Sequence, residues 1–213
     1  MNGLQRVGAV AAILEAVIYI TAFIFFGAIW NFPTNADSAQ VFAFLAENRA
    51  VLSLVNLMMY VVFGILLAVL VLAIHERLKS NAPSLSRVAS IFGIAWVVLV
   101  IASGMIANIG LGTAIDISNT NPEQAMTVWL TINAIVEGLG GGNEIVGGLW
   151  VLLLSIASLK GNKLPKGLTF LGLFVGSIGV LTAYPAHVLT EIFGLSQIVW
   201  FIWLGVYMLR NPS

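Results

Sequence analysis

The sequence is poor in charged residues and contains no cysteine. Only 8% of its 213 residues are charged, whereas an ordinary soluble domain is about a quarter charged. With 60% hydrophobic residues, the chain has too little polar surface for a water-soluble fold. The lack of cysteine excludes disulfide bonds, thiolate metal ligands and a cysteine nucleophile. The net charge of zero argues against nucleic acid as a partner.

Familiar enzyme motifs are also missing. The sequence contains no G-x-S-x-G, H-E-x-x-H, Walker or Rossmann pattern. Only two histidines are present, His75 and His187, fewer than an intramembrane zinc hydrolase is expected to carry. A role without catalysis or a cofactor is therefore favoured over an enzyme, while a metal site is left open.

Long apolar runs occupy most of the chain. A membrane span needs roughly 20 predominantly apolar residues, and windows of about this length predict an all-α bundle of six spans in a single domain, residues 1–213. The predicted spans are Val7–Trp30, Ala50–Ile74, Val88–Leu111, Met126–Leu159, Gly167–Tyr184 and Thr190–Leu209. The first is a full span long and lacks a small-x-small cleavage site, so it is interpreted as a retained helix rather than a signal peptide.

The distribution of cations predicts the orientation. If six spans are threaded, eight of the nine lysines and arginines fall on one side of the membrane and only Arg49 falls on the other. The positive-inside rule then places both termini in the cytoplasm.

Two outer connections carry signals for the start of a helix. Residues 37–40, DSAQ, fit a capping box, so a short amphipathic helix should follow. That helix is either a lid lying at the outer interface or a lead-in to the second span. The run Asn121-Pro122-Glu123 predicts that the fourth helix begins near Pro122.

The fourth segment is too long for one straight span. Residues 122–159 would extend ~57 Å as a helix, against a hydrocarbon core of ~30 Å. Its centre reads VEGLGGGNEIVGG, and glycine costs about 1 kcal/mol relative to alanine in a helix. We expect a kink or break at Gly138–Gly142. In a continuous helix, one face would instead form a glycine groove with two carboxylates, made of Glu137, Gly140, Gly141, Glu144, Gly147 and Gly148.

Ionisable residues within the spans are the main candidates for function. A charged side chain at membrane depth costs at least ~2.5 kcal/mol, so Glu144 and Glu15 should face the bundle interior. Each is either functional or a neutral, hydrogen-bonded acid. Polar residues expected near them or at the outer boundary are Asn143, Glu137, Asn108, His187 and Glu191. These could supply a cation site, although the simpler interpretation of the last two is a surface pair one turn apart.

Several short motifs in the C-terminal half carry a resemblance. GGLW at residues 147–150 is followed by LPKG at 164–167, by Leu171-Gly172 and Gly176, and by WFIWLG at 200–205. This half of the chain resembles a family of small six-span bacterial membrane proteins classed as a domain of unknown function. The resemblance implies a bacterial or archaeal inner-membrane protein, and it transfers no catalytic residue because that family has no assigned activity.

Three functions follow from these observations. The first is a proton- or cation-coupled transporter or channel with an outward-facing polar cavity around Glu144 and Asn143, and with Glu15 as an inner relay. The second is a non-catalytic protein that packs a lipid, a partner subunit or a second copy of itself against the glycine groove. The third is a membrane enzyme with a metal centre formed by carboxylates and His187. In each case the surroundings are the lipid bilayer.

Overall fold

All regular elements among the described residues are helical, which confirms the predicted all-α class. The computed structural model describes residues 3–141, 144–184 and 186–211. Five stretches are long and apolar enough to cross a membrane, namely Gly3–Ile29, Arg49–Leu78, Pro83–Ser118, Pro122–Gly161 and His187–Arg210. They fit a multi-pass membrane protein and coincide with five of the six predicted spans. The remaining predicted span, Gly167–Tyr184, corresponds to a shorter apolar helix of 16 residues, Lys166–Leu181.

Several of these stretches are compound helices. Helix α1 (Gly3–Ile24) continues into a π-helical turn, η1 (Phe25–Ile29), and α2 (Ser38–Glu47) follows after a loop. The second rod joins α3 (Arg49–Asn56), η2 (Leu57–Val62) and α4 (Phe63–Leu78). The remaining elements are α5 (Pro83–Ser118), α6 (Pro122–Val136), η3 (Glu137–Gly141), α7 (Ile145–Gly161), α8 (Lys166–Leu181) and α9 (His187–Arg210).

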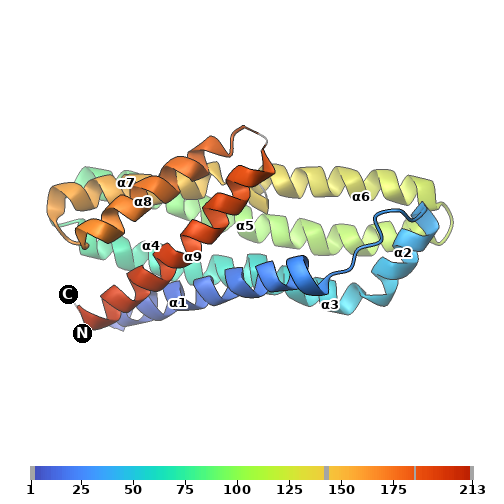
Figure 1. Cartoon of the computed structure of the whole chain (residues 1–213), viewed down its shortest axis with the longest axis horizontal. Coiled ribbons are helices and arrows are strands. Elements are labelled where there is room, and N and C mark those ends of the chain that lie inside the picture. The colour runs from blue at the N-terminus through green and yellow to red at the C-terminus, as the bar shows by residue number, and fades with distance from the viewer. Residues whose placement is uncertain (1–2, 142–143, 185, 212–213) are drawn as a thin grey trace.

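The helices form an elongated bundle organised around α5. Figure 1 shows α5 running along the molecule, with α7 beside one half of it and α6 beside the other. Both chain termini lie at the same end, where α1, α4, α7, α8 and α9 gather. The main core fills this end and contains three neighbouring indole rings, which meet at tilted and edge-to-face angles. The ring centroids of Trp96 and Trp150 are 6.0 Å apart, and those of Trp150 and Trp200 are 5.8 Å apart.

A second, smaller core lies at the opposite end, where α2 packs against α5 and α6 (Figure 1). Its buried residues are Val41, Phe42, Leu45, Leu52, Leu111, Ala114, Ile115 and Ala125. The predicted capping box is confirmed, because the Gln40 N–H donates to the Asp37 carboxylate at 2.8 Å and the Asp37 N–H donates back to the Gln40 side chain. The start of the next helix is also confirmed at Pro122, with Asn121 as its cap.

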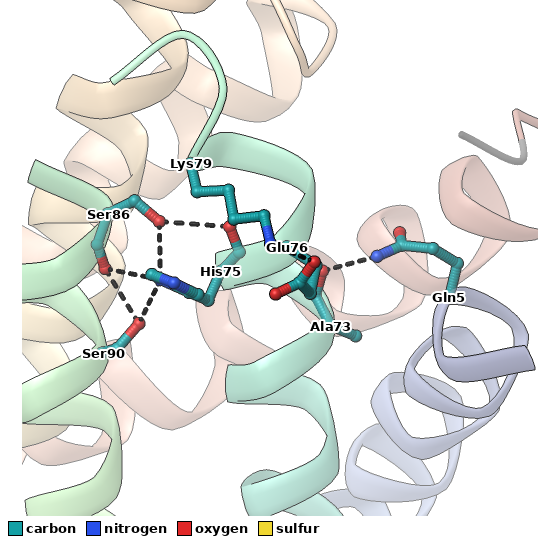
Figure 2. Close-up of polar contacts among 7 residues, drawn as sticks. All are labelled: Gln5, Ala73, His75, Glu76, Lys79, Ser86 and Ser90. Carbon is teal, nitrogen blue, oxygen red and sulfur yellow. Dashed lines mark hydrogen bonds and ion pairs between the residues drawn. The ribbon is translucent and has the colours of Figure 1, made fainter. Parts of the chain in front are cut away.

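Buried polar contacts fasten α1, α4 and α9 together near the chain termini. The Gln5 side-chain amide donates to the Ala73 carbonyl at 2.6 Å, as Figure 2 shows. The Arg77 guanidinium donates to the Gln5 amide oxygen at 3.1 Å and to the Asn211 carbonyl at 2.6 Å. It also lies over the Tyr207 ring, 5.4 Å from the centroid. This end of the bundle is therefore closed by paired polar groups.

His75 links α4 to α5 at the same end of the molecule. Its Nδ1 lies 3.0 Å from the hydroxyl oxygens of both Ser86 and Ser90 (Figure 2). Those hydroxyls already donate to carbonyl oxygens, Ser86 to His75 and Ser90 to Ser86. In this arrangement Nδ1 carries the proton and donates to them. His75 thus links the two helices through hydrogen bonds.

Candidate functional site

A cavity of about 400 Å³ lies between the helices at the level where α6 gives way to α7. Its walls come from α1, η1, η2, α4, α5, η3 and α9, with Glu144 contributed just before α7. Aromatic and aliphatic side chains form most of the lining. Among the lining residues that the structure describes, Glu144 supplies the only carboxyl group and none is basic, while hydroxyls come from Tyr19, Tyr60 and Thr190. The predicted polar cavity is therefore a mostly apolar one with a single acid.

The backbone of Glu144 is held firmly where α7 begins. Its N–H donates to the Thr182 hydroxyl at 2.9 Å, and that hydroxyl donates to the Gly179 carbonyl at 2.7 Å. Its carbonyl accepts from the Gly148 N–H. The residue is only 7% exposed, and its Oε2 has no hydrogen-bond partner within the described part of the chain. A buried acceptor of this kind is costly to leave unmatched, so it is well suited to a donor on a ligand.

The backbone leaves the helical conformation beside this acid. Gly140 has φ 136° and ψ 16°, a region that is essentially restricted to glycine. A Cβ added there would meet no atom within 4 Å, because Gly140 borders the cavity. This position lies inside the range expected to break. Gly142 and Asn143 are outside the described residues, so the predicted role of Asn143 is not placed.

Glu15 is fully buried but does not line the cavity. Neither of its carboxyl oxygens has a partner among the described residues. Tyr19, one turn farther along α1, does line the cavity and lies within electrostatic reach of both Glu144 and Glu15. On α9, which packs against α1, Gln197 and Trp200 are also fully buried with unpartnered polar atoms. Both acids that were expected to face the bundle interior are therefore buried. Glu144 lines the cavity, and Glu15 lies one turn of α1 away from the lining residue Tyr19.

Four predicted outer residues do not join the cavity wall. Glu137, His187 and Glu191 are exposed, although Glu137 comes within electrostatic reach of the lining residue Tyr60. His187 and Glu191 lie in the first turns of α9, as the lining residue Thr190 does, but neither is among the lining residues. The fourth residue, Asn108, is also absent from the lining.

Asn108 ties α5 to α3. Its amide oxygen accepts from Asn56 at 3.1 Å, and its amide nitrogen donates to the Ser53 carbonyl at 3.2 Å. Over the described residues, no three histidine, aspartate or glutamate side chains come together as a metal site. The polar residues expected at the outer boundary therefore do not come together as a cation site. Helix α2 contributes no residue to the cavity lining.

The glycine groove of the fourth segment is filled by the chain itself. A Cβ at Gly147 would lie 2.7 Å from the Trp96 ring, and one at Gly148 would lie 2.6 Å from the Gly179 backbone. The first contact brings α5 against α7, and the second brings α8 against α7. Gly141 is not described beyond its backbone. Docking of a lipid or partner subunit at Gly147 and Gly148 would therefore require α5 or α8 to move away.

Sequence reasoning missed most of the aromatic lining. Tyr60, Trp96 and Phe193 reach the cavity from three different helices, and the buried Trp96 indole N–H has no partner among the residues that the structure describes. The available signal was weak: a tyrosine hydroxyl or an indole within an apolar run needs a polar neighbour. The sequence does not tell which helix supplies this polar partner, because that depends on how the helices pack.

Comparison of the chain with protein-family models, curated proteins and solved structures found no match. The chemistry of the cavity must then indicate its ligand. Small-molecule sites are typically apolar clefts of about 300–1,000 Å³ with a few placed polar groups. Aromatic faces attract cations, and the carboxylate of Glu144 complements positive charge. The arrangement suits an apolar molecule with one cationic group.

Proposed function

We propose that this protein is a membrane transporter that binds lipophilic cations and exchanges them for a proton at Glu144. The observation that carries the proposal is the unpartnered Oε2 of Glu144 in the wall of an otherwise apolar cavity. A lipophilic cation would place its charged group at Glu144 and its apolar body against Tyr19, Trp96 and Phe193.

The ligand is an organic cation rather than a metal ion. Small inorganic cations require several oxygen ligands, whereas the described lining offers one carboxyl and a few hydroxyls. An organic cation already carries its own apolar surface, so burying it removes that surface from water and costs less desolvation than burying a hydrated ion.

Exchange of the cation for a proton follows because the described cavity lining has a single acid, Glu144. A carboxyl group that holds a proton carries no charge for the cation, so the two ligands compete for Glu144. Tyr19 and Tyr60 both interact electrostatically with Glu144; Tyr19 also interacts with Glu15, and Tyr60 with Glu137. Glu15 would serve as an inner station, because Tyr19 lies within reach of both acids.

We propose six crossings with both termini in the cytoplasm of a bacterial cell, and a fourth span interrupted at Gly140. The shared position of the termini at one end (Figure 1) and the positive φ of Gly140 support this topology. Helix α8 would be the fifth crossing. Its 16 residues rise ~24 Å, less than the ~30 Å hydrocarbon core, and local thinning of the bilayer accommodates such a mismatch.

Single cysteines test this topology cleanly, because the natural chain contains none. Asn119→Cys lies in the turn after α5 and Ser80→Cys in the turn after α4. In intact bacteria, a membrane-impermeant maleimide should label Asn119→Cys and leave Ser80→Cys unlabelled until the cells are lysed. The opposite pattern would reverse the proposed orientation, and labelling of both in intact cells would reject the crossing between them.

Transport is tested in liposomes containing the purified protein, with the membrane potential clamped at zero by potassium and valinomycin. The interior is set one pH unit more acidic than the outside, and tetraphenylphosphonium is the probe. Exchange of one cation for one proton should concentrate the probe inside by about tenfold, since about 1.4 kcal/mol corresponds to a factor of ten. Choline, a hydrophilic cation of equal charge, is the control and should not accumulate. Failure of the probe to accumulate above protein-free liposomes would reject the proposal.

A further inference from the structure

Helices α1 and α9 meet near the chain termini and separate farther along. A Cβ at Gly205 would lie 2.8 Å from the Ala9 carbonyl oxygen, so the backbones touch there. At Gly194 the contact is instead with the ring of the Phe23 side chain, at 2.9 Å. Beyond this point the two helices diverge, as Figure 1 shows. The cavity has lining residues on both η1 and the first turns of α9, so it occupies the wedge between these two elements.

The cavity extends to the surface of the bundle in this wedge. Phe23 and Phe26 line the cavity and are nevertheless 38% and 44% exposed. Gly27 also lines it, and a Cβ there would meet no atom within 4 Å. Thr190 forms the facing edge on α9. The rim of the cavity at the surface therefore consists of Phe23, Phe26 and Gly27 on one side and the first turn of α9 on the other.

The depth of this rim matches the outer part of a bilayer. Phe26 follows Arg6 by twenty residues, a rise of ~30 Å, which is the thickness of the hydrocarbon core. With Arg6 at the cytoplasmic boundary, the rim lies where outer-leaflet acyl chains meet their headgroups. Tyr184, 71% exposed in the connection between α8 and α9, fits the aromatic belt found at that depth.

We propose that the ligand enters sideways from the outer leaflet, through the gap between η1 and the first turns of α9. This inference rests on the proposed function and specifies its substrates as cations dissolved in the membrane rather than in water. Amphipathic cations concentrate at the boundary between headgroups and acyl chains, which is the level of the rim. The π-helical turn η1 allows Phe25 to remain buried against Trp30, with ring centroids 5.5 Å apart, while Phe26 and Gly27 face the gap.

A series of alkyltrimethylammonium ions of increasing chain length tests the route in wild-type protein in liposomes. Association rates are measured by stopped flow and referred to the aqueous concentration of each ion. For access from the membrane, the rate constant should rise in proportion to the membrane–water partition coefficient. For access from water, it should stay constant along the series, and that result would overturn the lateral route.

Gly27→Trp tests the gap itself, because a Cβ at this position meets no atom within 4 Å and the larger side chain starts in open space at the rim. Association and dissociation should both slow by about tenfold or more. The matched control is Ala28→Trp, on the same turn, exposed and outside the lining. Unchanged rates in a Gly27→Trp protein that elutes and melts like the control would overturn the route.

The two proposals fail in different ways. If the wild-type protein binds the ions and Glu144→Gln does not, but the rate is independent of partitioning, the binding function stands and only the lateral route falls. If the wild-type protein binds none of the ions, the proposed function falls and the route falls with it.

Discussion

Replacing Glu144 with glutamine weakens lipophilic cation binding by roughly 10- to 100-fold and abolishes proton-driven uptake. Glutamine keeps the shape of the side chain and an acceptor oxygen, so the cavity is preserved. It loses the negative charge, and a hydrogen bond to a charged group contributes about 1.5–3 kcal/mol. It also has no proton to exchange in the physiological range, so residual binding cannot be coupled to a pH gradient. Calorimetric titration with tetraphenylphosphonium and the liposome uptake assay measure the two effects separately.

Glu137→Gln is the matched control for this substitution. It removes a carboxylate seven residues earlier in the same segment, but one that is exposed and outside the cavity lining. Solvent screens an exposed charge strongly, so affinity and uptake should stay within about twofold of the wild type. Full uptake by Glu144→Gln, or an equal loss in both variants, would remove Glu144 from the mechanism.

Substituting Gly148 by leucine prevents formation of the native bundle. A Cβ at this position would lie 2.6 Å from the Gly179 carbonyl carbon and 2.7 Å from the Val180 nitrogen. These are backbone atoms, so no change of rotamer relieves the clash, and α7 and α8 must separate. Even Gly148→Ala should cost about 1–3 kcal/mol, as overpacking does elsewhere, and lower Tm by roughly 2–12 °C. The leucine variant should aggregate or elute as a heterogeneous species in detergent.

Gly138→Leu separates this packing effect from the intrinsic cost of changing a glycine. Gly138 lies on the same segment, and a Cβ there would meet nothing within 4 Å. The variant should fold and melt within a few degrees of the wild type, because replacing glycine in a helical turn is on its own mildly stabilising. A normal Tm for Gly148→Leu would contradict the close approach of α7 and α8.

Gly148→Ala should also weaken cation binding. The Glu144 N–H donates to the Thr182 hydroxyl just beyond the end of α8, so a shift of α8 away from α7 would also disturb the position of Glu144.

Local features of the structure could be predicted because short stretches of chain determine them. Apolar composition requires the backbone to satisfy its hydrogen bonds internally, which favours helices in a membrane. The caps at Asp37 and Asn121 involve residues three positions apart, so local sequence specifies them. The inward orientation of Glu15 and Glu144 followed from the cost of exposing an acid to lipid.

The sequence by itself determined the helical class, these helix starts and the depth of the buried acids along their helices. Only the tertiary structure decided which side chains meet. It brought Tyr19, Tyr60 and Trp96 to the wall beside Glu144, left His187 and Glu191 outside, and filled the glycine face at Gly147 and Gly148. The physical reason is that periodicity gives the position of a residue along a helix and around its axis. The contacts it makes depend on how neighbouring helices rotate, cross and diverge, which arises from packing across the whole bundle.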